Sequence, residues 1–246
     1  MKHMRFQIIL GLSLIALSAL FYFVHYLIFN DLHHIFIYLV GDIAFVPIEV
    51  LLVTMILHKL LEDREKKSKF KKLNMVIETF FSEMGMYLIK MFSDADSGLE
   101  SIRDSFMIRN NWSSSDFKRA AIHLKKYEFK ADIRKIELND LHGYLAEKRD
   151  FVMRLLQNPV MLEHETFTDL IRAILHLTEE LASRDGFENI TDTDYEHLAG
   201  DIQRAYSRLV NQWMNYMEYL KLEYPYLFSL AIRTNPFDEN AKAAVE

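Results

Sequence analysis

The chain has 246 residues, enough for one domain of ordinary size beside a membrane-associated segment. It contains no cysteine, which excludes disulfide frameworks, thiolate catalysis and cysteine-based metal sites. The net charge is −6, but residues 1–72 hold nine basic and six acidic residues, which leaves 20 and 29 in the remainder. This acidic remainder argues against nucleic acid as a partner. Seven Gly and four Pro among many good helix formers favour an all-α fold.

The first apolar run, Ile8–Phe29, contains His25 as its single ionisable residue. Its 22 residues are enough to cross a bilayer, because about 20 residues at 1.5 Å each span the hydrocarbon core. The alternative is a cleaved signal peptide, with a basic start, an apolar middle and a cleavage site at Ala16-Leu17-Ser18. The run continues well past that site, which favours a membrane span at about residues 6–29.

The second apolar run, Ile35–Leu57, predicts a second span at about residues 35–58. The connection between the two runs, residues 30–34, contains no Lys or Arg, whereas basic residues precede the first run and follow the second. The positive-inside rule then places both termini in the cytoplasm. Residues 1–61 are therefore predicted to form a transmembrane hairpin in the plasma (inner) membrane.

Two carboxylates and a proline interrupt the second run. Asp42 and Glu49 lie two helical turns apart, about 10 Å along one helix face, and Pro47 would leave the carbonyl of Ile43 without its helical donor. Charged carboxylates inside a span cost about 2.5 to 3.5 kcal/mol each and usually face a bundle interior or water. A homo-oligomer with a polar path along these residues would resolve the cost. The alternative is that they lie near the interface or are protonated structural groups.

A basic cluster follows the second run and is expected to contact anionic lipid. Its members are Lys59, Arg64, Lys66, Lys67, Lys69, Lys71 and Lys72.

Residues 62–92 are predicted to continue the helix as a connecting amphipathic segment. Apolar residues recur there in steps of three and four, as in a coiled-coil seam; they are Phe70, Leu73, Ile77, Phe80, Met84, Tyr87 and Met91.

Residues 93–235 are predicted to form a cytoplasmic helical bundle. A loop-rich segment at 93–115 precedes helices at about 116–129, 133–156, 163–184 and 193–224, and Pro159 and Pro225 end two of them. Thr193 and Glu196 suggest a capping box for the longest helix. The residues from Pro236 to the end are expected to form a flexible tail.

No motif identifies a reaction, so no catalytic residue and no cofactor is expected, and a non-enzymatic role is favoured. His176 with Glu179 or Glu180, and Asp194 with His197, each share a helix face in the way that metal ligands in helical bundles do. Exposed polar residues are the default interpretation of such pairs, and no metal site is predicted.

Three segments resemble an uncharacterised prokaryotic family of two-span membrane proteins. They are residues 45–53, residues 72–83 and the ending that runs from Tyr224-Pro225-Tyr226 to Asn235-Pro236-Phe237. The resemblance implies the two-span architecture and no activity. The leading hypothesis is thus a homo-oligomeric, channel-like membrane protein with a polar path at Asp42 and Glu49. The alternative is a membrane-anchored scaffold or sensor whose acidic domain recruits a cytoplasmic protein.

Overall fold

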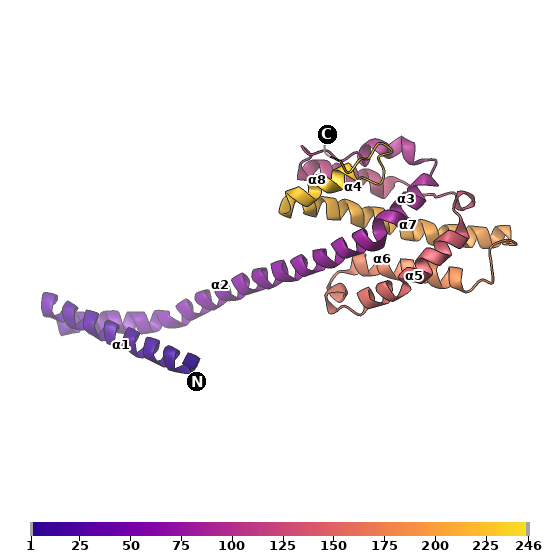
Figure 1. Cartoon of the computed structure of the whole chain (residues 1–246). Coiled ribbons are helices and arrows are strands. Elements are labelled where there is room, and N and C mark those ends of the chain that lie inside the picture. Colours follow the sequence, from indigo (N-terminus) through magenta and orange to yellow (C-terminus); the bar gives the residue numbers. More distant parts are fainter. Residues whose placement is uncertain (1, 245–246) are drawn as a thin grey trace. The chain divides into compact units, whose positions relative to one another are not determined.

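The computed structural model describes residues 2–244, with side chains at all of these positions except 2–4, 162 and 163. Every regular element in that range is helical, so the predicted all-α fold class is confirmed. The chain divides into two compact units, Met1–Lys66 and Lys67–Glu246, which are called here the hairpin and the distal domain. Figure 1 labels the helices of both units.

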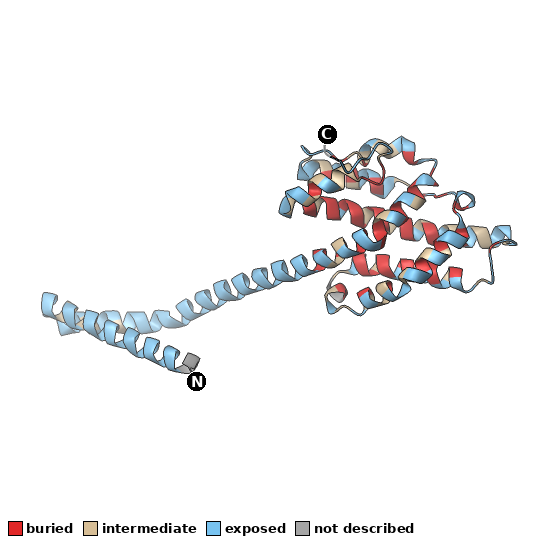
Figure 2. Ribbon diagram, in the orientation of Figure 1, coloured by how far each residue is buried: buried red, intermediate tan, exposed pale blue. Residues whose placement is uncertain are grey.

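The hairpin consists of α1 (Lys2–Phe29) and the first part of α2 (Leu32–Phe80). Asn30 makes the turn in a left-handed conformation, with φ of 49°, which asparagine tolerates better than most residues. The Asp31 carboxylate then accepts a hydrogen bond from the backbone N–H of His34 at 3.2 Å and caps the new helix. In Figure 2 both helices carry the colour of exposed residues over nearly all of the hairpin.

The second apolar run and the basic cluster lie on one uninterrupted helix. As expected, α2 continues beyond Lys59, because the sequence from there to Phe80 contains neither Gly nor Pro. Pro47 is accommodated inside the helix.

A π-helical turn, η1 (Phe81–Gly85), separates α2 from α3 (Met86–Asp94) and corrects the predicted apolar seam. Leu73, Ile77, Phe80 and Met84 are buried as expected, but Phe70 is 53% exposed and Tyr87 is 46% exposed. A π-helical turn holds an extra residue and therefore rotates the following side chains around the helix axis. The buried positions after it are instead Leu88, Ile89 and Phe92.

The rest of the distal domain is built from helices and short 3-10 turns. They are η2 (Leu99–Ser105), α4 (Ser114–Lys126), η3 (Ile133–Lys135), α5 (Leu138–Leu156), η4 (Pro159–Glu163), α6 (Glu165–Ala182), α7 (Asp192–Glu223) and α8 (Pro225–Arg233).

Local signals explain most of these helix ends. Ser113 and Asp116 form a capping box at α4, and Pro225 occupies the first turn of α8 after ending α7. At α7 the structure differs from the expected cap, since the hydroxyl of Thr191 accepts the hydrogen bond from the backbone N–H of Asp194. Thr191 takes this role because it has an extended backbone, whereas Thr193 already lies within the helix.

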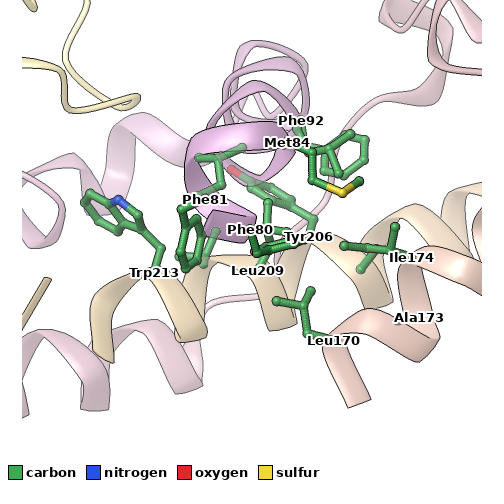
Figure 3. Packing of buried hydrophobic residues seen from close by; sticks show 14 of the residues in the cluster. Phe80, Phe81, Met84, Phe92, Leu170, Ala173, Ile174, Tyr206, Leu209 and Trp213 are labelled. Atoms are coloured by element: carbon green, nitrogen blue, oxygen red, sulfur yellow. The ribbon is translucent and has the colours of Figure 1, made fainter. Parts of the chain in front are cut away.

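The core of the distal domain forms around α7. Figure 3 shows Phe80, Phe81 and Met84 packed with Tyr206 and Leu209 of α7, beside residues of α6. The ring of Phe81 stacks on Tyr216 of α7 with centroids 5.2 Å apart. Residues 62–92, which were expected only to connect the hairpin to the helical bundle, thus supply a large part of the core of the distal domain.

The segment expected to be a flexible tail begins with a buried aromatic residue. Phe237 is 3% exposed and stacks on Phe106, with ring centroids 4.0 Å apart, while Trp213 lies 5.1 Å away. The side-chain amide of Asn235 donates a hydrogen bond to the Phe106 carbonyl at 2.8 Å. The chain end is therefore anchored to the domain at least as far as Phe237.

Candidate functional site

The two intramembrane carboxylates predicted from the sequence have different surroundings in the hairpin. The Asp42 carboxylate accepts a hydrogen bond from the Tyr22 hydroxyl at 3.4 Å. Both residues line a pocket of about 530 Å³ between α1 and α2, together with Ser18 and His25. Glu49 is exposed, and its side chain makes no hydrogen bond or ion pair within the described residues 2–244. The structure thus places Asp42, and not Glu49, in a mainly apolar pocket with a few polar groups from α1 that were not predicted as site residues.

The basic cluster is exposed along α2. Lys66 pairs with Glu62 one turn earlier, with Nζ and Oε1 2.6 Å apart. Three acidic residues are interspersed at positions 62, 63 and 65, so the segment from Lys59 to Lys72 carries a net charge of about +4 from seven basic side chains. This charge lies immediately after the apolar part of the helix, where a membrane boundary would require it.

The most concentrated group of ionisable side chains lies between α6 and α7. These two helices are joined by residues 183–191 and share the largest interface in the distal domain. Two ion pairs join the helices, Glu180 with His197 and His176 with Asp201, and Arg184 in the connection pairs with Asp194 of α7. The residue numbers fall on α6 as they rise on α7, so the helices are antiparallel. Facing residues can therefore meet turn by turn.

Four of these residues form what is called here the His–carboxylate cluster, namely His176, Glu180, His197 and Asp201. His176 Nε2 lies 3.8 Å from Glu180 Oε1 and 3.5 Å from Asp201 Oδ1. His197 Nε2 lies 3.4 Å from Glu180 Oε2 and 3.5 Å from Asp201 Oδ2. Each imidazole thus lies near both carboxylates. The imidazole of His176 is near one oxygen of each carboxylate, and the imidazole of His197 is near the other.

Asp201 is the buried member of the cluster. Its side chain is 3% exposed, whereas those of the two histidines are about half exposed. Asp201 Oδ1 accepts a hydrogen bond from Arg204 Nη1 at 2.5 Å, but Oδ2 is buried without a hydrogen-bond partner. A buried carboxylate oxygen without a donor is costly, so its presence calls for an explanation.

Arg184 holds Glu180, one member of the cluster, in place. Its guanidinium donates to both oxygens of Asp194, at 2.9 and 2.6 Å, and to Glu180 Oε2 at 3.1 Å. These hydrogen bonds lower the pKa values of Glu180 and Asp194, so both are carboxylates at neutral pH. Arg184 therefore fixes the Glu180 carboxylate beside the two imidazoles.

The sequence alone indicates half of the His–carboxylate cluster. The sequence-based prediction placed His176 with Glu180 on one helix face, but it paired His197 with Asp194 and missed Asp201. The available signal was a repeated pattern, His-Leu-x-x-acid, at residues 176–180 and 197–201. Residues four apart share a helix face, and a short connection makes neighbouring helices antiparallel, so the two patterns face each other.

A second buried carboxylate lies in the loop segment at 93–98. Asp96 is 5% exposed, and its Oδ1 accepts hydrogen bonds from the Tyr127 hydroxyl at 2.8 Å and the Gly98 backbone N–H at 3.1 Å. Burial raises the pKa of Asp96, and these hydrogen bonds partly oppose the shift. The geometry is that of a carboxylate that holds a turn against the core.

Comparison with known proteins supports the division into two units. Residues 2–61 match the family model described as the N-terminal helical domain of MJ1433, and residues 69–233 match its C-terminal helical domain. The chain belongs to the MJ1433 family. The uncharacterised protein MJ1433 of Methanocaldococcus jannaschii is 42% identical over 241 residues, which cover 98% of this chain and 97% of that protein. No solved structure matches the chain.

The predicted resemblance to an uncharacterised family is therefore confirmed, and the family description carries no activity. The two apolar helices at the start of the chain are long and apolar enough to cross a membrane. By themselves, their length and composition are weak evidence for membrane association, because signal sequences and core helices of soluble proteins share both.

Proposed function

We propose that this protein is a two-pass plasma-membrane protein that holds its acidic helical domain at the cytoplasmic face. The observation that carries the proposal is the exposure of the apolar hairpin. Throughout residues 5–57 the side chains are exposed or half exposed, and none is buried. An exposed apolar surface of this extent needs a lipid or protein environment.

Two simpler explanations account for less of the sequence. The core helix of a soluble protein would be buried by its own chain, whereas the hairpin is exposed. A cleaved signal sequence would explain α1 but not the second apolar run in α2, which leads into the basic cluster. A membrane hairpin explains both runs and the position of the charge.

The charge distribution supports the orientation. The turn at residues 30–34 has no Lys or Arg, and the basic cluster follows the second run within a few residues. Basic residues this close to a span are those that set its orientation, so both ends of the hairpin are assigned to the cytoplasm. The basic cluster would then lie against anionic headgroups, at roughly 1 kcal/mol per residue.

Homo-oligomerisation of the hairpin belongs to the same proposal. Asp42 has one weak hydrogen bond within its own chain, and Glu49 is exposed on an apolar helix. Neighbouring copies would remove both carboxylates from lipid, and a polar path between the copies would make the assembly channel-like. The exposure of Glu49 favours the channel-like assembly, because a carboxylate with a purely structural role would have a hydrogen-bond donor within the hairpin.

The alternative use of the assembly is recruitment of a protein. Residues 73–246 carry 20 basic and 29 acidic residues, which suits a cytoplasmic partner with a basic surface. In that case the hairpin serves as an anchor and the two carboxylates as contacts between copies. Loss of ion flux in Glu49→Gln, with the oligomer intact, would distinguish the channel from this scaffold.

Cysteine labelling tests the topology directly, because the natural chain has no cysteine. Single variants His33→Cys in the turn and Lys125→Cys in the distal domain would be treated with a membrane-impermeant maleimide. In intact cells we expect labelling of position 33 alone, and in inverted vesicles labelling of position 125 alone. Equal labelling of both positions from the same side would refute the two-pass arrangement.

Mass measurement of the nanodisc-embedded protein tests the oligomer. A ring of four or more copies would support the polar path and justify flux assays in liposomes. A monomer would refute homo-oligomerisation, and a dimer would leave the anchor without a path.

A further inference from the structure

We infer that the distal domain binds one divalent transition-metal ion, with Zn²⁺ as the best fit, between His176, Glu180, His197 and Asp201. This inference is independent of the membrane proposal, because it depends only on the interface of α6 and α7. No description of the family assigns such a site.

The ligand atoms gather closely enough for one ion to bind after the side chains rotate. Zn–N and Zn–O bonds of about 2.0 to 2.1 Å place neighbouring ligand atoms of a tetrahedral site about 3.3 to 3.4 Å apart. Each of the four contacts between an imidazole and a carboxylate measures 3.4 to 3.8 Å. One ligand atom each from His176, Glu180 and Asp201 also lies within 4.8 Å of the other two. His197 lies outside this group of three, and the two imidazoles contact different oxygens of each carboxylate. Rotation of His197 and of the Glu180 carboxylate would bring one atom from each of the four side chains toward a common ion.

The unpartnered Asp201 oxygen is the independent sign of a ligand. Asp201 Oδ2 is buried, has no hydrogen-bond donor, and lies 3.5 Å from His197 Nε2. A cation between them would satisfy this oxygen, whereas an ordinary surface ion pair would not require the aspartate to be buried. The other oxygen of Asp201 is held by Arg204, so the carboxylate is already oriented.

The surroundings resemble those of ligands that are held before the ion arrives. Arg184 and Arg204 each fix one carboxylate, which is the role that outer hydrogen-bond partners have in metal sites. The two histidines, at 47% and 54% exposed, give an ion access from solvent. The carboxylates of Glu180, Asp194 and Asp201 and the guanidiniums of Arg184 and Arg204 lie together here. With neutral imidazoles, their summed charge is −1.

The donor set indicates which ions would bind. Two imidazole nitrogens and two carboxylate oxygens suit Zn²⁺ and its neighbours in the first transition row, whereas Mg²⁺ and Ca²⁺ prefer oxygen ligands alone. Co²⁺ serves as the spectroscopic probe, since tetrahedral Co²⁺ absorbs visible light far more strongly than octahedral Co²⁺.

The test uses the full chain in nanodiscs, purified with a tag that contains no histidine and stripped with a chelator. Native mass spectrometry after addition of Zn²⁺ should show one ion per chain, and Co²⁺ should give the strong bands of tetrahedral coordination. A mass unchanged by Zn²⁺, or Co²⁺ bands of octahedral intensity, would overturn the inference. So would displacement of Zn²⁺ by millimolar Mg²⁺.

Variants locate the ion. The double variant His176→Gln with His197→Gln changes two half-exposed side chains and should fold, and Zn²⁺ affinity should fall by at least about 100-fold, beyond the loss typical of outer partners alone. Glu180→Gln should weaken binding and its exposed neighbour Glu179→Gln should not. His123→Gln, a change outside the cluster, should also bind normally. Undiminished binding in the double variant would overturn the assignment.

Discussion

The ring of Phe81 lies so close to Gly85 that a β-carbon added at residue 85 would be 2.6 Å from Cδ1 of Phe81. It would also lie 2.9 Å from Cε1 of Phe80, and both rings are completely or almost completely buried. Glycine at this position therefore permits the two aromatic rings to pack against the backbone of the π-helical turn.

We expect Gly85→Ala to lower the free energy of unfolding of the distal domain by about 1 to 3 kcal/mol, the usual cost of overpacking a core. Alanine is otherwise the better helix former, by about 0.5 to 1 kcal/mol. Gly143→Ala in α5 is the matched control, because no atom lies within 4 Å of the added carbon there. Chemical denaturation followed by circular dichroism should show opposite signs for the two variants, and equal stabilisation would contradict the packing argument.

Phe237→Ala should destabilise the distal domain by about 3 kcal/mol, the low end of the range for Phe→Ala in a core, because a chain end can relax. The loss follows from the contacts with Phe106 and Trp213, so the tryptophan emission should shift as well. Tyr226→Ala serves as control, since Tyr226 is 72% exposed. A melting temperature of Phe237→Ala equal to that of the control would show that the chain end is not anchored.

Asp96 should give the stability a specific pH dependence. Burial raises its folded-state pKa, so above the unfolded value of about 3.9 the folded chain holds this proton more tightly than the unfolded chain does. The stabilisation is complete below about pH 4 and is lost as the pH rises through the folded pKa. The unfolding free energy of wild type minus that of Asp96→Asn should therefore fall over this interval. A constant difference would contradict the shift; exposed Asp104→Asn is the control.

The basic cluster should control the orientation of the hairpin. Replacing Lys66, Lys67, Lys71 and Lys72 by Gln removes four positive charges near the second span, and we expect a mixture of orientations in the His33→Cys labelling assay. Four lysines farther along the chain, at 118, 125, 126 and 130, form the matched control, because charges more than about 20 residues from a span have little influence. Equal effects of the two sets would contradict the positive-inside explanation.

The sequence predicted the helices well where single residues mark their ends. Pro225 ends α7 as expected, because the effect of proline is local. The cap of α4 is Ser113, a few residues before the helix start expected at about 116. The apolar seam was predicted correctly only from Leu73 to Met84. Phe70 before it is exposed, and the π-helical turn after it depends on how Phe81 and Gly85 pack. The burial of Phe237 was not predictable for a similar reason, because Phe106 and Trp213 are distant in sequence.

The same distinction applies to the candidate sites. Asp42 and Glu49 stand out in the sequence because a carboxylate in an apolar run is conspicuous without any partner. The His–carboxylate cluster depends on two helices, and Asp201 acquires its significance only when it is buried opposite His176. Helical periodicity identifies which residues share a face, but it does not indicate which faces meet.

The packing of Phe81 on Tyr216 and of Phe92 on Tyr206 also constrains how the domain folds during synthesis. The first apolar helix of the distal domain leaves the ribosome more than 100 residues before its partners on α7. This aromatic surface therefore stays unpaired until α7 has been synthesised. A nascent chain that stalls before residue 206 would therefore expose an aggregation-prone aromatic surface to chaperones and proteases. The domain would fold only near the end of translation.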